Sequence, residues 1–263
     1  MSSPSAPRMT LQDIEQLERV PLARRLVVDS TYALLHRALA SSSELPAHCF
    51  LPLGGQSQPG EALTARAFLG KVHQSANLLA DLGMGSQDVV ALLLPDLLEK
   101  EVLLWAGQAA GVVCPIPPSL PAPQVVDLLQ AAQAKVLVAP SPPVSQELWQ
   151  KSEQVRRQVK SVAVVLQVRG PGNEREAAYA FNALLEEYPA DRLHTGRQIA
   201  LDDLAVFFPT RDMTGTPGLV PLTHGHLLYA AWAFGLVTTL APGEVLLHGL
   251  SLFFHEWRPA AGS

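Results

Sequence analysis

Between residues 64 and 168 the chain alternates short, continuously apolar runs with segments of helical periodicity. The apolar runs cover residues 88–94, 112–116, 135–139 and 162–168, and the helical segments cover 64–83, 99–111, 123–133 and 146–159. A run that is apolar at every position is typical of a strand covered on both faces. Helices of ten to fifteen residues between such runs indicate parallel strands joined by crossovers. We therefore expect an α/β fold, a doubly wound, mostly parallel sheet with helices on both faces.

The segments on either side of this alternation set the expected domain limits. A Ser/Pro-rich tail and a charged amphipathic helix over 11–26 make up an N-terminal part, residues 1–28. Residues 29–263 form one α/β domain, which begins with a helix over 31–40 capped by Asp29 or Ser30. Further elements are expected as strand, turn and loop over 46–60, a helix over 174–188, and strands over 204–208 and 245–250.

Composition excludes several classes of partner. The 263 residues carry a net charge of −5 and are 48% hydrophobic. The hydrophobic content is too high for a disordered chain. The negative net charge argues against a nucleic-acid partner, whose binding requires a basic surface. Cys49 and Cys114 lie far apart and show no metal-ligand spacing, which indicates two buried thiols in a reducing compartment. Because the tail lacks the apolar core of a secretion signal, we expect a cytoplasmic protein.

The stretch from Leu227 to Ala241 is almost entirely apolar. Its densest part is fifteen residues long, shorter than the roughly 20 residues that cross a bilayer, so we expect a core helix and no membrane span. If the segment lay exposed instead, it would offer a surface for a protein partner or for self-association.

A Thr/Gly-rich loop follows the apolar run that ends at Phe208. Thr210, Thr214, Gly215 and Thr216 lie in it, before an apolar helix that begins near Thr223 and His224. Backbone N–H groups and hydroxyls in such a loop form a cradle for anionic oxygens, and small residues allow close backbone approach. Many Thr/Gly loops merely turn the chain, so the loop alone leaves both interpretations open.

The loop resembles the phosphate-binding loop of the adenylate-forming acyl-CoA synthetases, the AMP-binding family. That family's pattern is close to T-[GS]-G-T-T-G-x-P-K followed by T-H. Segments 77–83, 88–95, 106–111 and 115–117 also resemble its N-terminal lobe. The resemblance implies a ligase that activates a carboxylic or fatty acid with ATP and passes the acyl group from AMP to coenzyme A, with Mg²⁺ assisting. It implies nucleotide contacts by Thr210, Arg211, Thr214, Gly215, Thr216, Thr223 and His224.

The sequence departs from the family pattern at the loop. Arg211 and Asp212 occupy two small positions, Met213 replaces a threonine, and Gly218 replaces the lysine. Asp212 places a negative charge near a triphosphate, and only Arg211 compensates for the missing cation. We therefore expect weak or absent adenylation, as in a pseudoenzyme, and assign no catalytic residue.

A second family motif, L-P-L-F-H, matches residues 250–254 with Phe254 at its histidine and His255 shifted by one. The resemblance implies that Phe254 and His255 line the acyl pocket. The family's later elements are not recognisable before Ser263, so we expect a truncated, N-terminal part of such an enzyme.

Other functions stay open as alternatives. The chain could be a non-catalytic binding or interaction module that keeps the α/β frame, or a truncated product without a role of its own. His224 and His226 alternate like metal ligands, and further candidate donors are His248, His255 and Glu256. No motif fixes these side chains as a convergent set, so we expect no metal site. Residues 249–253 stop one residue short of the G-x-S-x-G elbow of hydrolases, which makes an esterase a minor alternative.

Overall fold

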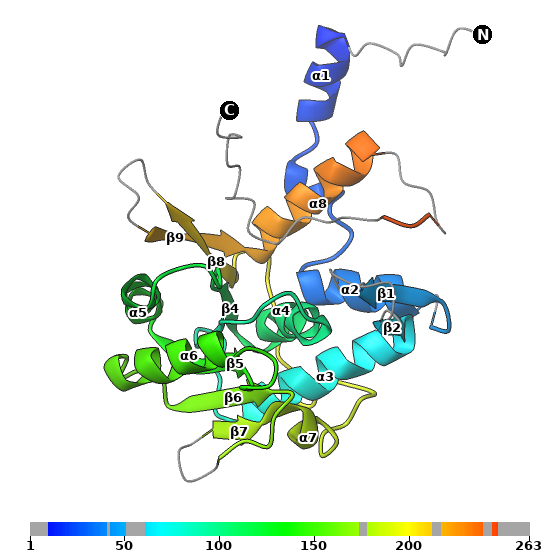
Figure 1. Ribbon diagram of the computed structural model, residues 1–263. Helices are drawn as coiled ribbons and strands as arrows, with labels where there is room; N and C mark the ends of the chain where they lie inside the picture. Colours follow the sequence, from blue (N-terminus) through cyan, green and yellow to red (C-terminus); the bar gives the residue numbers. More distant parts are fainter. Residues whose placement is uncertain are drawn as a thin grey trace, which may run out of the picture.

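A seven-stranded sheet organises the computed structural model, which describes residues 10–40, 43–50, 61–173, 178–211, 217–238 and 244–246 (Figure 1). Across the sheet the strands run β7 (Ala178–Ala180), β6 (Val164–Val168), β5 (Ala134–Pro140), β3 (Val89–Leu92), β4 (Val112–Pro115), β8 (Leu204–Arg211) and β9 (Pro217–Thr223). Every neighbouring pair is parallel except β8 and β9, which are antiparallel. The predicted α/β class and mostly parallel sheet are confirmed.

Helices cover both faces of the sheet and create two hydrophobic cores. Helices α3 (Ala65–Asp81) and α4 (Leu98–Ala110) cover one face, and α5 (Ala122–Ala131) and α6 (Gln146–Gln158) cover the other. Along β3, Val90 and Leu92 face the first pair, whereas Val89 and Ala91 face the second. Because successive side chains of a strand point to opposite faces, two covered faces require the unbroken apolar runs seen in the sequence.

The N-terminal residues add three short helices, of which the third packs against α3 and α4. Helix α1 (Leu11–Glu18) and a 3₁₀ helix (Leu22–Arg25) replace the single helix expected over 11–26, because Pro21 lacks an N–H and disfavours helix in the residue before it. Helix α2 (Thr31–Ala40) follows, and the Ser30 hydroxyl accepts from the Ala33 N–H at 3.1 Å, which confirms the expected cap.

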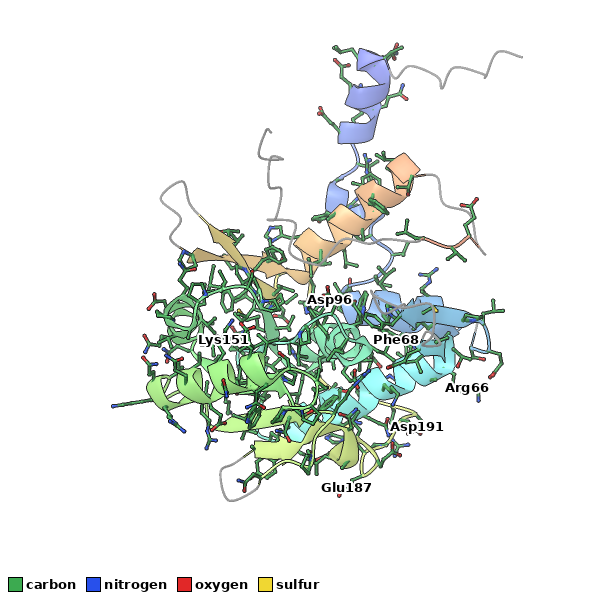
Figure 2. The ribbon with its side chains drawn as sticks, in the orientation of Figure 1. Arg66, Phe68, Asp96, Lys151, Glu187 and Asp191 are labelled. Carbon is green, nitrogen blue, oxygen red and sulfur yellow. The ribbon has the colours of Figure 1, made fainter. Side chains whose placement is uncertain are left out.

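Strands β1 (Pro46–Phe50) and β2 (Glu61–Thr64) form a separate antiparallel pair. The His48 ring of β1 stacks on Phe68 of α3 with the centroids 5.7 Å apart (Figure 2), so this pair packs directly against the helix layer. The part of the predicted strand, turn and loop from residue 51 to residue 60 lies outside the described ranges.

The helix predicted over 174–188 is wrong. Strand β7 extends the sheet beside β6, and only the short helix α7 (Phe181–Leu185) follows it. The β6 backbone gains a partner through β7, and the side chain of Phe181 becomes fully buried, so tertiary packing overrides local helix propensity here. Of the strand predicted over 245–250, residues 245 and 246 are not in a strand and the rest lie outside the described ranges.

Strand β9 and helix α8 (His224–Thr238) are the last strand and helix in the described residues, and α8 extends away from the sheet (Figure 1). The sequence did not predict β9. The expected core helix is correct only for the first turns of α8, since Phe234 and Val237 are 51% and 83% exposed in the structure. In the described part of the chain, no helix is both long enough and apolar enough to cross a membrane.

Candidate nucleotide-binding hairpin

The candidate phosphate-binding loop joins β8 to β9 at one end of the strands, called here the carboxyl edge of the sheet. Strands β3, β4, β5, β6 and β8 run parallel, so their carboxyl ends share that edge. Ligands of open α/β sheets bind at this edge. Strand β8 ends there at Arg211, whose Cα lies opposite that of Pro217 in the antiparallel pairing. Residues 212–216, which include Asp212, Met213, Thr214, Gly215 and Thr216, and the Arg211 side chain lie outside the described parts.

Thr210 and Gly218 face each other across the hairpin, next to its turn. A Cβ added to Gly218 would meet the Thr210 Oγ1 atom at 3.8 Å and no other described atom within 4 Å. The Gly218 backbone is therefore open to close approach beside a hydroxyl. Those features fit an anionic phosphate oxygen, which needs donors and room.

Thr223 and His224 lie at the opposite end of the same hairpin. The Thr223 Cα pairs with that of Leu204, the first residue of β8. At about 3.3 Å per residue, this end lies about 20 Å from Thr210 along the strand. The structure therefore brings Thr210 and Gly218 together but does not place Thr223 and His224 beside the same phosphate.

The Thr223 side chain caps helix α8. Its hydroxyl accepts from the His226 N–H at 3.2 Å, and its own N–H donates to His226 Nδ1 at 3.1 Å. This reciprocal pair satisfies backbone groups that the helix start leaves free. Within the described ranges, no three His, Cys, Asp or Glu side chains gather closely enough to hold a metal ion.

His224 is fully buried and joins three helices. Its Nδ1 atom lies 2.8 Å from the Thr31 hydroxyl of α2, and that hydroxyl donates to Gln108 Oε1 of α4, also at 2.8 Å. The pKa of His224 is lowered to about 4, chiefly by burial and also by the Arg197 guanidinium, while Asp203 acts in the opposite direction. The ring is therefore neutral at neutral pH.

A polar cluster that the sequence did not predict lies at the carboxyl end of β6. Arg169 Nε donates to Glu99 Oε1 at 2.7 Å, its Nη2 donates to Glu61 Oε1 at 2.8 Å, and Asn182 Nδ2 donates to Glu99 Oε1 at 3.1 Å. Burial favours a raised pKa for Glu99, but hydrogen bonds, chiefly from Arg169, hold it below the ordinary value. The cluster connects β2, α4, the end of β6 and α7. Its members are up to 121 residues apart in the sequence, so no local pattern could predict it.

Beside this cluster lies a buried lysine. Lys100 of α4 is 1% exposed and pairs with Asp96 at 2.8 Å (Figure 2). The four-residue spacing of these two side chains is the one feature by which the sequence could have indicated the pair.

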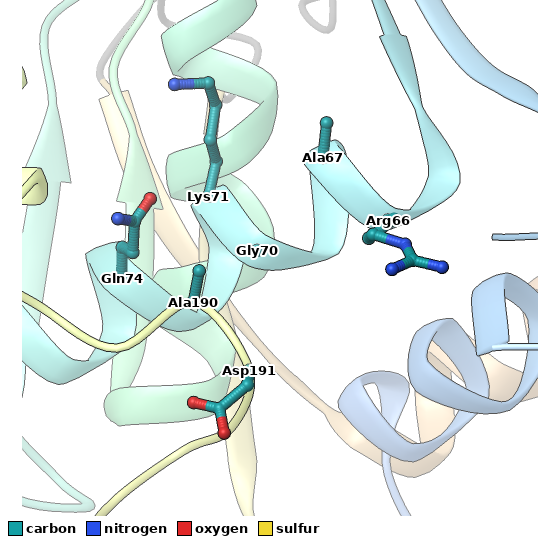
Figure 3. Close-up of a pocket in the computed structure, with 7 residues that line it drawn as sticks. All are labelled: Arg66, Ala67, Gly70, Lys71, Gln74, Ala190 and Asp191. Atoms are coloured by element: carbon teal, nitrogen blue, oxygen red, sulfur yellow. The ribbon is translucent and has the colours of Figure 1, made fainter. Parts of the chain in front are cut away.

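A hollow of about 390 Å³ lies elsewhere, between α3 and the chain near Ala190 (Figure 3). Two of its three charged side chains have partners outside the hollow: Arg66 pairs with Glu44, and Asp191 pairs with Arg192. The lining carries two cationic side chains, Arg66 and Lys71, and one carboxylate, Asp191, so the hollow does not concentrate charge of one sign (Figure 3). It therefore competes poorly with the hairpin as an anion site. The predicted acyl-pocket residues Phe254 and His255 lie outside the described ranges.

The chain is similar to known acyl-CoA ligases in sequence. It is 27% identical over 214 residues to the marinolic acid–CoA ligase of Pseudoalteromonas sp. (strain SANK 73390), a match that covers 81% of this chain and 32% of that protein. It is 28% identical over 210 residues to the acetyl-coenzyme A synthetase of Sodalis glossinidius (strain morsitans), covering 73% of this chain and 31% of the relative. The chain thus spans about a third of the length of the curated relatives it matches.

The fold is similar to that of solved acyl-CoA ligases. A long-chain-fatty-acid-CoA ligase from Archaeoglobus fulgidus superposes with a TM-score of 0.67 at 19% identity, over 81% of this chain and 40% of that one. The sequence profile described as AMP-binding enzyme matches residues 35–255, which is most of the chain. Together with the hairpin at the carboxyl edge of a mostly parallel sheet, this match shows that the chain belongs to the AMP-binding enzyme family.

Proposed function

We propose that this chain binds a phosphate group of ATP or AMP at the β8–β9 hairpin, as the nucleotide-binding part of a protein of the acyl-CoA ligase type. The observation that supports this most is the pairing of Thr210 with the open backbone of Gly218 at the carboxyl edge of the sheet. The arrangement offers a hydroxyl and room for close backbone approach, the two requirements for seating a phosphate oxygen.

The reaction proposed for a protein of this type has two steps, adenylation of a carboxylate and transfer of the acyl group to coenzyme A. A carboxylate oxygen attacks the α-phosphorus of ATP, the bond to pyrophosphate breaks, and an acyl adenylate forms; the thiol of coenzyme A then displaces AMP. In the first step negative charge builds on the phosphate oxygens, so cations and oriented donors stabilise it. Mg²⁺ bound with the nucleotide would neutralise part of that negative charge.

This chain is proposed to perform the first step poorly. Gly218 occupies the position where the family pattern has lysine, and Asp212 adds a negative charge to the loop. Arg211 is the cation that remains there, and it lies opposite Pro217 at the end of the pairing. Loss of one charge-assisted contact to phosphate costs about 1.5–3 kcal/mol of binding or transition-state energy. We therefore propose weak ATP binding and slow adenylation, in the cytoplasm and on a small carboxylic or fatty acid.

The test measures ATP binding by calorimetry and carboxylate-dependent exchange of pyrophosphate into ATP, with acetate, anthranilate and a fatty acid as separate substrates. The native chain should bind ATP weakly and exchange slowly. A variant carrying Arg211→Ser, Asp212→Gly, Met213→Thr and Gly218→Lys should bind ATP at least tenfold more tightly. Equal affinity of both proteins would show that the loop substitutions do not cause the deficit, and absence of binding to both would refute the proposed nucleotide site.

A second candidate function is a non-catalytic interaction module, and the exposed half of α8 favours it. Phe234, Leu236 and Val237 are all more than half exposed there. Exposed apolar groups on one helix are typical of contact surfaces. Sedimentation of the chain and of a Leu236→Asp variant separates the candidates: a dimer that the substitution dissociates supports an interaction role, whereas two monomers argue against self-association.

A further inference from the structure

The hydrogen bonds around His224 restrict where its ring carries the proton. Two contacts of 2.8 Å meet at the Thr31 hydroxyl, one from His224 Nδ1 and one from Gln108 Oε1. Each contact needs one proton, and a hydroxyl supplies only one. The Gln108 Nε2 group donates to the Leu104 carbonyl at 2.8 Å, which fixes Oε1 as the atom that faces Thr31. The second proton must therefore come from the His224 ring.

The opposite tautomer would use a weaker contact. The Thr31 N–H points at the same Nδ1 atom from 3.3 Å, beyond the usual range of about 2.7–3.2 Å. If Nδ1 accepted that N–H, one of the two 2.8 Å contacts would join lone pairs and repel. The shorter contacts decide the balance, because hydrogen bonds weaken with distance and lone pairs at 2.8 Å repel.

The surroundings of the other ring nitrogen agree. His224 Nε2 is buried and has no hydrogen-bond partner among the described residues, and the same holds for Nε and Nη2 of Arg197. Arg197 is held by the Ala109 carbonyl at 3.4 Å and lies 3.8 Å from Asp203. The positive guanidinium is near enough to act on His224 electrostatically. With Nδ1 protonated, Nε2 carries a lone pair, so no ring N–H is buried without an acceptor among the described residues.

We infer that His224 is a positioning residue: its neutral ring, protonated on Nδ1, links Thr31 of α2 and Gln108 of α4 to the foot of the β8–β9 hairpin. The main chain completes the link, since the His224 N–H donates to the Asp203 carbonyl at 3.0 Å and the Gly225 N–H donates to the Leu201 carbonyl at 2.7 Å. The consequence for phosphate binding at the far end of the hairpin rests on the proposed function; the link itself does not.

The first test reads the proton directly. In the ¹⁵N NMR spectrum of the full chain labelled in its histidines, one neutral histidine besides His73, whose Nδ1 donates to the Ala190 carbonyl at 2.9 Å, should have a protonated Nδ1 and an unprotonated Nε2 at neutral pH. Its resonances should vanish in His224→Asn and persist in His36→Asn, a control at an exposed histidine of α2. A His224 ring protonated on Nε2 would overturn the inference.

The second test measures the link between α2 and α8 by amide hydrogen exchange. It is done without nucleotide, so it does not depend on ATP binding. In His224→Asn the amide reproduces a donor at the position of Nδ1, whereas in His224→Gln the amide reaches only the position of Nε2. Amides of α2 and of the first turn of α8 should exchange about tenfold faster in His224→Gln than in His224→Asn, because a buried acceptor loses its partner. Equal exchange in the two variants would overturn the link.

Two variants of Thr31, the hydrogen-bond partner of His224, test the link even if a His224 variant fails to fold. Thr31→Ser keeps the hydroxyl and Thr31→Val removes it. The same tenfold difference should separate these two proteins, and equal protection would again contradict the link. If the native chain binds no ATP while both exchange tests succeed, the proposed function fails and the positioning role stands.

Discussion

At the scale of single residues, the sequence indicated which side chains matter better than what they do. The Thr223–His224 pair follows the loop in the family pattern, so both were expected to contact nucleotide. The structure buries His224 completely and pairs it with Thr31, 193 residues earlier in the chain. A contact between residues so distant in sequence depends on how helices pack, and no local pattern records it.

The lowered pKa of His224 predicts how stability responds to acid. The folded value is about 4 and the ordinary value is 6.5, so between these values the unfolded chain binds more protons. His224 therefore leaves stability unaffected above about pH 6.5 and lowers it progressively as the pH falls toward 4. At about 1.4 kcal/mol per pKa unit, the loss is on the order of 3 kcal/mol.

Urea unfolding between about pH 7 and pH 5 measures this response. The charged groups that act on the pKa of His224 are Arg197 and Asp203. His73 also has a lowered pKa, so it contributes to the pH dependence as well. The His224→Asn variant keeps all three, so its shallower pH dependence isolates the His224 contribution. Equal slopes for the two proteins would show that His224 is not buried as a neutral ring.

Gly218 allows a sharper test of the phosphate site. A lysine there has room, since the nearest described atom to an added Cβ is Thr210 Oγ1 at 3.8 Å. Opposed residues of a strand pair share a face, so its ammonium would lie on the Thr210 side. Gly218→Lys should tighten ATP binding about tenfold through one charge-assisted contact. Gly218→Met, of similar length without charge, should bind ATP as the native chain does; a matching gain in this control would contradict an electrostatic cause.

At the scale of elements, the sequence predicted what is buried on both faces and failed at the margins. Strands β3 to β6 were recognised because both cores require apolar residues at every position. Strand β9 was missed because Pro217, Gly218 and Pro221 all disfavour strands, yet an edge strand needs hydrogen-bond donors on only one side. The helix predicted over 174–188 failed for a related reason, because pairing of residues 178–180 with β6 outweighed local propensity.

The burial of β4 predicts the reactivity of its cysteine. Cys114 is fully buried in the core under α5 and α6, and desolvation raises the pKa of its thiol to about 12. Cys49 is exposed on β1, so the expectation of two buried thiols is wrong for this residue. Since the thiolate is the reactive form, iodoacetamide should modify Cys49 alone in the folded chain and both thiols in denaturant. Peptide mass mapping reads the result, and comparable labelling of Cys114 in the folded chain would contradict the core assignment.

At the scale of the whole molecule, the family and the fold were predictable because several motifs recur in one order along one α/β frame. The exposed half of α8 was not predictable, since an entirely apolar helix gives no periodicity that distinguishes its buried side. The predicted nucleotide residues also divide between the two ends of one hairpin. Only the register of β9 on β8 reveals that division.

Hydrogen exchange of the purified chain with and without millimolar ATP tests the central assignment most directly. The hairpin account predicts slower exchange in peptides that contain the carboxyl end of β8 and the start of β9, and unchanged exchange in α3 beside the Ala190 hollow. Protection at α3 and none at the hairpin, or no protection anywhere, would contradict it.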